Sequence, residues 1–484
     1  MKKLVKFSFF IVFCFCSFSL LGQTFNISGN AKTYAGDTLK MYALMDYISK
    51  NEYLIAKAAV DKNGNFTFSG RISEITPAYI DLIVFKGLIY LQPGKNCEIV
   101  LPEKQEIAIQ DKLNPYFKKR EFYIKSINPD KEDLNYLIPE FEKHYNAALG
   151  KVLYSLKGIS KASTDSIENA ISQKFSSKNK YFEDYKNYRF AILDYTAYHR
   201  SKTDIVRDLF TNKDVLTNNL AYSEVFDEIF SNIFIAGKSS AITIKDLYLG
   251  IKDKSYNTLK KQFLANENVT SEKFADYLIL KGLRDAYYFD SYPKENLVAI
   301  VDSMAQTCND LFFRKIAANL SKDFTTLLCG YAPAQILLKD INDEEYYLEK
   351  SSGKFVYLTF FNPDSYTSNG DLELLKTIYK EVPPEMLDIV TIFVSQNKED
   401  MKKLLQSDSD IKWKVLWYNY DNSLLKKYNI RAFPMYYLIN PEGVLSMNPA
   451  PGPQEDFPSK FSAAYRSWKN EQYRKQYREN QGIK

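Results

Sequence analysis

Residues 354–375, KFVYLTFFNPDSYTSNGDLELL, decide the fold of the C-terminal part of this chain. A mostly apolar run, residues 355–361, leads into a polar turn, and apolar residues then recur at helical spacing. This pattern predicts a buried strand that feeds the start of a helix. The free N–H groups at a helix start make it a common place for a catalytic group. The turn carries Ser365 and Ser368 and no cysteine.

The whole chain has the size and composition of a multidomain globular protein. Its 484 residues predict roughly three domains. Hydrophobic residues at 45% and charged residues at 25% are ordinary values for globular proteins. Aromatic residues are frequent at 15%, which is explained either by a Tyr-rich binding surface or by a compositional habit of the source genome.

Residues 1–22 have the features of a secretory signal peptide. Lys2, Lys3 and Lys6 precede an apolar stretch, residues 7–21, that is too short and too interrupted for a membrane span. We therefore expect export to the periplasm or cell envelope; an uncleaved N-terminus would instead associate the protein with the membrane. Removal of the leader lowers the net charge from +5 to +2, because three lysines and no acid leave. That balance gives no reason to expect nucleic acid as a partner.

The chain has too few cysteines and histidines for most redox and metal sites built from these residues. Cys97, Cys308 and Cys329 remain after the leader, so at least one thiol is unpaired in a monomer, and their pairing stays open. None has CxxC spacing. The two histidines, His144 and His199, lie in charged, helical-looking stretches where a solvated side chain is expected. No metal-ligand spacing is present, so we expect neither a metal site nor a cofactor.

Two regions of different character precede the C-terminal part. Residues 23–104 alternate apolar and polar positions over short runs, which predicts a β-sandwich. Within them, DKNGN at 61–65 predicts a hairpin turn, and a calcium loop is disfavoured because no glutamate closes it. Residues 105–329 have helical periodicity, with helix starts near Asp133 and Thr164, and predict a helical domain without a catalytic motif.

From residue 330 the pattern alternates strands with helices. The sequence predicts the following elements in order: an edge strand at 335–340, a turn at 348–353, the strand and helix described above, a strand at 387–395, a helix at 399–406, a strand at 413–418, a short helix at 422–428, a strand and turn at 430–443, and a terminal helix at 457–480.

Two motifs give this region a family resemblance. GKFVYLTFFNPDSYTSNGDLELLKTIYKEV at 353–382 resembles the GKxVLLxFWAxWCxxCxxExPxLxxLY segment of the membrane-linked periplasmic thioredoxin family. YNIRAFPMYYLINPEGVL at 428–445 resembles that family's YxVxxxPTxFLIDxxGxI, and GYAPAQILLKD at 330–340 loosely resembles its APxFxLxD lead-in. The resemblance implies a thioredoxin-like fold over 330–470, followed by a charged tail at 471–484. It also implies that the Phe433–Pro434 peptide bond is cis.

The fold class expected for the whole chain is therefore multidomain α+β and α/β: an N-terminal β-sandwich, a central helical domain and a C-terminal thioredoxin-like fold. A β-rich N-terminal domain resembles the one often found in exported thioredoxin-like proteins, through VDKNGNFTFSG at 60–70 and NPYF at 114–117.

The redox cysteines of the family align with Ser365 and Ser368. Thiol–disulfide exchange requires a thiolate, and serine neither ionises comparably nor forms a disulfide. We expect these serines to cap the helix instead. Peroxiredoxins carry Pro-x-x-x-Thr-x-x-Cys; Pro363, Thr367 and Gly370 have that spacing here, with glycine in the peroxidatic position. The domain is predicted to be redox-inactive.

The first functional hypothesis is a non-enzymatic protein that binds a peptide or protein of the cell envelope in the groove beside the cis-proline. The residues expected at this groove are Phe361, Asn362, Ser365, Tyr366, Ser368, Phe433 and Pro434. The alternative is a thiol-disulfide oxidoreductase that uses cysteines outside the family positions. A third possibility is a structural envelope module whose helical domain binds the partner.

Overall fold

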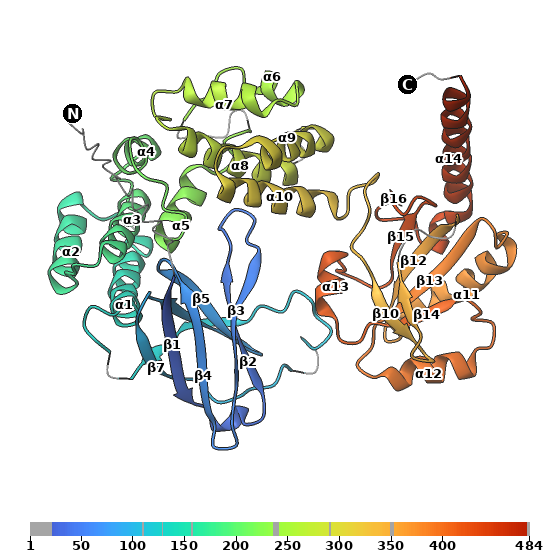
Figure 1. Cartoon of the computed structure of the whole chain (residues 1–484), viewed down its shortest axis with the longest axis horizontal. Coiled ribbons are helices and arrows are strands. Elements are labelled where there is room, and N and C mark those ends of the chain that lie inside the picture. The colour runs from blue at the N-terminus through green and yellow to red at the C-terminus, as the bar shows by residue number, and fades with distance from the viewer. Residues whose placement is uncertain are drawn as a thin grey trace, which may run out of the picture.

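The computed structural model describes residues 22–108, 111–127, 129–155, 158–235, 242–289, 292–348 and 353–481 (Figure 1). The predicted leader lies outside these residues except for Gly22, as does most of the turn predicted at 348–353. Buried apolar side chains form three clusters, one mainly in the N-terminal strands, one in the central helices and one in the C-terminal part. Within the described residues, no helix combines the length and apolar character needed to cross a membrane.

The N-terminal strands form two sheets that share one hydrophobic cluster. One sheet has the order β4-β1-β7-β9 and the other β3-β2-β5-β6-β8. The strands are β1 Gln23–Asn30, β2 Thr38–Leu44, β3 Glu52–Ala59, β4 Asn65–Ile72, β5 Thr76–Leu82, β6 Phe85–Leu91, β7 Asn96–Val100, β8 Arg120–Tyr123 and β9 Lys125–Ser126, with a short 3-10 helix, η1, at Lys32–Tyr34.

Two details of this region differ from the sequence-based expectation. The turn at 61–65 is present, and Asp61 accepts hydrogen bonds from the backbone N–H groups of Asn63 and Asn65. It connects β3 of one sheet to β4 of the other, so it is not a hairpin turn. Strands β8 and β9 lie beyond residue 104, because the chain returns to pair with β6 and β7 before the helices begin.

A loop of the N-terminal part reaches the C-terminal part. The Tyr116 hydroxyl donates to the Asn429 side chain at 2.7 Å, and the Arg431 guanidinium lies over the Tyr116 ring. The Asn422 side chain donates to the backbone oxygen of Lys112 at 3.2 Å. The predicted NPYF motif therefore contacts the segment that leads to Pro434.

The central region is helical, as its periodicity predicts. Its helices are α1 Leu134–Leu153, α2 Lys161–Lys174, α3 Lys180–Thr196, α4 Lys202–Leu209, α5 Leu220–Ile229, α6 Leu247–Lys252, α7 Tyr256–Leu264, α8 Glu272–Tyr288, α9 Lys294–Thr307 and α10 Leu311–Thr325. Asp133 caps α1 at the predicted position, whereas α2 begins earlier than predicted, with Ser160 as its cap. Tyr and Phe side chains fill the interior of this region; Phe141, for example, packs on Tyr145 and Phe182.

The C-terminal part is a mixed seven-stranded sheet flanked by helices (Figure 1). Its elements are β10 Leu337–Asp340, β11 Glu345–Tyr347, β12 Phe355–Phe361, α11 Tyr366–Glu381, β13 Leu387–Phe393, α12 Lys398–Ser407, β14 Lys414–Trp417, α13 Asn422–Lys427, β15 Met435–Ile439, β16 Leu445–Met447, a 3-10 helix η3 at Pro453–Glu455, and α14 Phe457–Asn480.

The strand order is β11-β10-β14-β13-β12-β15-β16. Strand β12 pairs in parallel with β13 and antiparallel with β15, and β13 pairs in parallel with β14. Helices follow the parallel strands, and the antiparallel pair β15–β16 precedes the last helix. This is the thioredoxin-like arrangement that the motifs imply. Strand β11, and not β10 as expected, forms the edge on that side.

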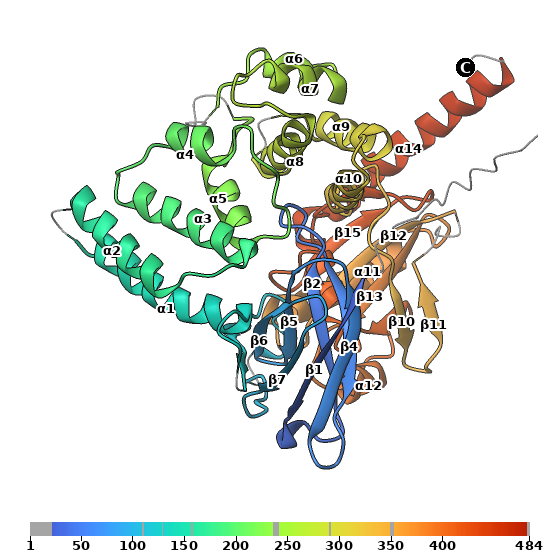
Figure 2. The ribbon, with the colours of Figure 1, turned by 60° about the vertical axis from the view of Figure 1, so that its left-hand side comes forward.

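Helix α14 begins against the sheet and then extends away from it (Figure 2). Phe457 and Phe461 are buried against β12, where Phe461 meets Phe355 edge-on at 5.5 Å between ring centroids. The predicted charged tail is helical up to Asn480. Its tyrosines, Tyr473 and Tyr477, are exposed.

The replacement Phe457→Ala should destabilise the C-terminal part by about 3–5 kcal/mol, the usual cost of removing a buried ring. Phe457 is fully buried and stacks on Tyr357 with 3.7 Å between ring centroids. All three tryptophans, Trp413, Trp417 and Trp468, lie in this part, so urea unfolding followed by tryptophan fluorescence reports on it alone. The exposed Tyr477, changed to alanine on the same helix, should shift stability by less than about 0.5 kcal/mol. Equal effects of the two changes would contradict this packing.

The replacement Glu168→Gln on α2 should stabilise the protein at high pH and not at low pH. Burial, and then the negative charge of Asp194, raise the pKa of Glu168 to about 7 from an ordinary value of 4.5. Because the folded state holds this proton more tightly than the unfolded chain, ionisation destabilises folding progressively as pH rises from 4.5 to about 7. We expect a gain on the order of 1–2 kcal/mol near pH 8 that disappears near pH 4, measured by thermal unfolding with far-UV circular dichroism. The same gain at both pH values would refute the assignment.

Candidate functional site

The turn between β12 and α11 is held by Ser365. This residue is the N-cap of α11, and its hydroxyl oxygen accepts a hydrogen bond from the backbone N–H of Ser368 at 3.2 Å. The bond satisfies one of the N–H groups that a helix start leaves free. The capping role predicted for Ser365 is confirmed, whereas the same prediction for Ser368 is wrong, because the Ser368 hydroxyl accepts from the backbone N–H of Asn362, outside the helix.

The same hydroxyl joins the turn to the second motif. Ser365 donates to the backbone oxygen of Phe433 at 2.9 Å, across 68 residues of sequence. The Phe433–Pro434 peptide is cis, as the family resemblance implies. One serine side chain therefore links the helix start to the cis-proline peptide.

Three of the expected groove residues are buried instead. Phe361 is 1% exposed and stacks on Phe393, because it ends β12 with its side chain in the core. Asn362 is 7% exposed, and its side chain accepts from the backbone N–H of Asp364 at 2.7 Å. Ser368 is 1% exposed, and its oxygen accepts from the Asn362 backbone N–H at 3.5 Å. The expectation that these three side chains line an accessible groove is wrong.

The other expected residues reach the surface. The Tyr366 side chain is 94% exposed at the first position of α11. Ser365, Phe433 and Pro434 are partly exposed beside it. Since Tyr366 makes almost no contact within the chain, it contributes little to folding and is available to a partner.

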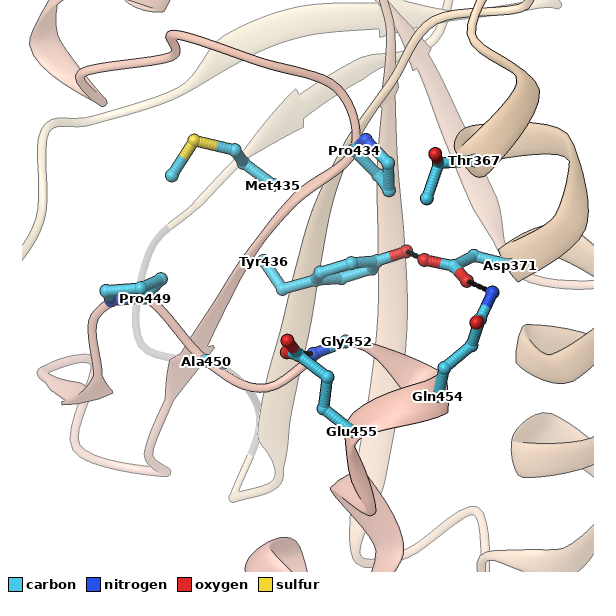
Figure 3. A pocket seen from close by; sticks show the side chains of 10 residues that line it. All are labelled: Thr367, Asp371, Pro434, Met435, Tyr436, Pro449, Ala450, Gly452, Gln454 and Glu455. Carbon is cyan, nitrogen blue, oxygen red and sulfur yellow. Dashed lines mark hydrogen bonds between the residues drawn. The ribbon is translucent and has the colours of Figure 1, made fainter.

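A cavity of about 320 Å³ adjoins Pro434 (Figure 3). One side is formed by Thr367 and Asp371 of α11, and another by Pro434 and the first two residues of β15. The remaining wall comes from residues 449–455, which include Pro449, the second cis-proline found among the described residues. The cavity brings together segments that are far apart in the sequence.

The side chain of Asp371 is the central polar group of this cavity. It is 4% exposed and accepts hydrogen bonds from the Tyr436 hydroxyl at 2.7 Å and from Gln454 Nε2 at 2.6 Å (Figure 3). Both donors are neutral, and within the described chain no lysine or arginine forms an ion pair with it. Burial and the bond to Asp371 raise the pKa of Tyr436 well above its ordinary value, so Tyr436 stays a donor at physiological pH.

Asp371 is not among the site residues predicted from the sequence, although the sequence pattern indicates that it is buried. Asp371 lies three residues after the buried Ser368 and four before the buried Leu375, so it occupies the inner face of α11. An acid on the apolar face of a helix marks a buried carboxyl. No comparable local signal identifies Gln454 or the cis bond before Pro449.

The three thiols are unpaired, and the surroundings of Cys97 and Cys308 oppose thiolate formation. Cys97, Cys308 and Cys329 are all free. Burial raises the pKa of Cys308, which lies beside Asp276, and burial also raises the pKa of Cys97, which lies 2.8 Å from the Ser126 hydroxyl. Cys329 is exposed. Among the residues with described positions, no group of three metal-binding side chains occurs.

Solved structures of thioredoxin-like proteins resemble part of this chain. One is the thioredoxin domain of a thiol-disulfide oxidoreductase from Bacteroides vulgatus, with 22% identity, coverage of 28% of this chain and 99% of that one, and a TM-score of 0.26. Another is StoA from Bacillus subtilis, with 20% identity, coverage of 24% and 87%, and a TM-score of 0.22. An exposed lipoprotein thioredoxin from Streptococcus pneumoniae has 24% identity, coverage of 24% and 87%, and a TM-score of 0.21.

No protein-family model and no curated relative matches the sequence. The similar structures have less than 25% identity and cover under a third of this chain, so they carry no information on its chemistry. The thioredoxin-like fold of the C-terminal part rests on its own strand order and on the cis-proline before β15.

The two serines of the turn should differ in their contribution to stability. Ser365→Ala removes a helix cap and a bond to Phe433, and should cost about 1–2 kcal/mol. Ser368→Ala removes a single long hydrogen bond and should cost less than about 0.5 kcal/mol. Ser365→Thr keeps both bonding functions and should restore most of the loss. Urea unfolding followed by tryptophan fluorescence measures all three; a Ser365→Ala protein as stable as the wild type would contradict the capping geometry.

Proposed function

We propose that this chain is an exported protein of the periplasm or cell envelope whose thioredoxin-like domain binds an extended peptide segment without thiol–disulfide chemistry. Residues 1–22 serve as its leader, and the N-terminal β-sandwich and central helical domain complete a three-domain protein. The observation that carries the proposal is the hydrogen bond from Ser365 to the Phe433 carbonyl oxygen. The bond keeps the helix start and the cis-proline together while serines occupy the positions of both family thiols.

The exposed aromatic side chains beside Pro434 support a peptide as the ligand. Tyr366 presents its aromatic ring to solvent, and Phe433 and Pro434 are partly exposed next to it. Aromatic side chains supply most of the binding energy at many protein interfaces. The resemblance adds that the surface beside the cis-proline contacts extended peptide in the thioredoxin family. The cavity on the other side of Pro434 offers a place for one side chain of such a peptide.

The alternative function is thiol–disulfide exchange through cysteines outside the family positions. The exposure of Cys329 favours it, whereas the raised pKa of Cys308 and the burial of its thiol oppose it. An insulin-reduction assay with a coupled reductase separates the two functions. We expect no turnover above background. Turnover that is lost in Cys329→Ser or Cys308→Ser would establish the alternative.

The replacements Tyr366→Ala and Phe433→Ala should each weaken peptide binding by roughly fivefold to thirtyfold, because each removes an aromatic contact of about 1–2 kcal/mol. The probes are peptides selected from a random library on the immobilised full chain, then labelled and measured by fluorescence anisotropy. The Phe433 replacement leaves the backbone oxygen that accepts from Ser365 in place.

The matched control is Tyr473→Ala. Tyr473 is 63% exposed on α14, away from the turn, so its loss should leave peptide affinity unchanged. If both site variants bind the selected peptides as tightly as the wild type, the groove is not the binding surface.

A further inference from the structure

We propose that the cavity beside Pro434 binds the cationic end of a lysine or arginine side chain of the bound peptide. The inference rests on the proposed function and adds a specificity to it: the peptide carries a basic residue where its chain passes the cis-proline. The cavity is large enough to hold one long side chain, since its volume of about 320 Å³ lies at the lower end of the range for ligand sites.

The first observation is the uncompensated charge of Asp371. Its carboxyl group is 4% exposed, lines the cavity and accepts one hydrogen bond on each oxygen. Each oxygen retains a further lone pair that can accept another hydrogen bond. Neither Tyr436 nor Gln454 carries a charge, so the hydrogen bonds orient the carboxylate without neutralising it. A buried charge normally has a counter-ion.

A second carboxylate lies on another wall of the same cavity. The Glu455 side chain accepts from the backbone N–H of Gly452 at 2.8 Å, which fixes its position (Figure 3). Asp371 and Glu455 act on a common neighbour: after burial, the two negative charges raise the pKa of Tyr357 further. The cavity therefore has a negative potential from two sides, which attracts a cation and repels an anion.

The remaining walls suit the apolar stem of a basic side chain. The apolar side chains of Pro434, Met435, Pro449 and Ala450 line the cavity. Long basic side chains bury their methylene groups on apolar surface while the charged end meets a polar partner. The ring of Tyr436 also lines the cavity and adds a surface that favours cations.

A neutral or acidic side chain fits this chemistry less well. The Tyr436 hydroxyl donates its only proton to Asp371, so it is not available to an incoming carboxylate, and the Gln454 amide has one N–H left to offer. A norleucine side chain would fill the apolar part and leave both carboxylates without a cationic partner. The cavity thus discriminates by charge rather than by shape.

The test uses four labelled pentapeptides, Ala-Ala-X-Ala-Ala, with X as lysine, arginine, norleucine or glutamate, and the full-length chain. Fluorescence anisotropy should show the lysine and arginine peptides binding about tenfold to a hundredfold tighter than the norleucine peptide, the usual worth of a hydrogen-bonded charge pair. Asp371→Asn should remove most of this preference and leave the affinity for the norleucine peptide unchanged. The exposed Glu455, changed to glutamine, should reduce the preference in part.

The control variant is Glu381→Gln, which removes an exposed acid at the far end of the same helix and should leave the preference intact. Unfolding followed by tryptophan fluorescence verifies that each variant is folded. If Asp371→Asn does not fold, Glu455→Gln still tests the charge preference, because Glu455 is at the surface and its replacement should not disturb folding. If wild type binds the lysine and norleucine peptides equally, the charge specificity is refuted and the peptide-binding function stands.

A small probe separates the two proposals further. Nα-acetyl-lysine methylamide contains the basic side chain without an extended peptide, and saturation-transfer NMR detects its binding. If no pentapeptide binds but this probe binds to the wild type and not to Asp371→Asn, the cavity specificity stands and the peptide function fails. Absence of binding by every probe overturns both.

Discussion

Strand β12 is the constraint on which the C-terminal part depends. All seven of its residues are buried, and it is paired on both edges, with β13 in parallel and β15 antiparallel. The register places Phe360 opposite Met435, the first residue of β15. The chain leaving β12 therefore emerges beside Pro434, which immediately precedes β15. Strand pairing alone therefore brings the turn and the cis-proline together, without any contribution from contacts between their side chains.

The Ser365 hydroxyl then fixes the start of α11 relative to the cis-proline peptide. It accepts from the start of α11 and donates to the carbonyl oxygen before Pro434. A hydroxyl performs both functions because it is donor and acceptor at once. The requirement to cap the helix does not depend on redox chemistry, so the shape of the site persists without thiols. A thioredoxin-like strand order and serines in place of the family cysteines are for this reason compatible in one domain.

The sequence predicted features that depend on local pattern. The apolar run of β12 and the cap at Ser365 each follow from a few adjacent residues, whereas the cis bond at Pro434 was implied by the family resemblance. Strand β8 was not predicted, because a four-residue strand pairs in parallel with β6 only through the tertiary fold. The burial of Phe361 and Asn362 was missed because a motif gives the position of a residue and not the direction of its side chain. The contact between Asp371 and Gln454 joins residues that are 83 positions apart in sequence, and the residues flanking either one do not indicate it.

The burial of Asp371 without a cationic partner among the described residues connects the fold to the proposed specificity of the cavity. Removing a carboxylate from water costs several kcal/mol, and two neutral hydrogen bonds offset only part of that cost. A protein that needed only a packed core at this position would be served equally well by an apolar residue. Tyr436 and Gln454 instead hold the carboxylate in place at the edge of a cavity, so no reorganisation is required when a cation arrives. The cost of the buried charge is consistent with a group maintained for binding, because the free energy lost in folding is recovered when a cationic partner pairs with it.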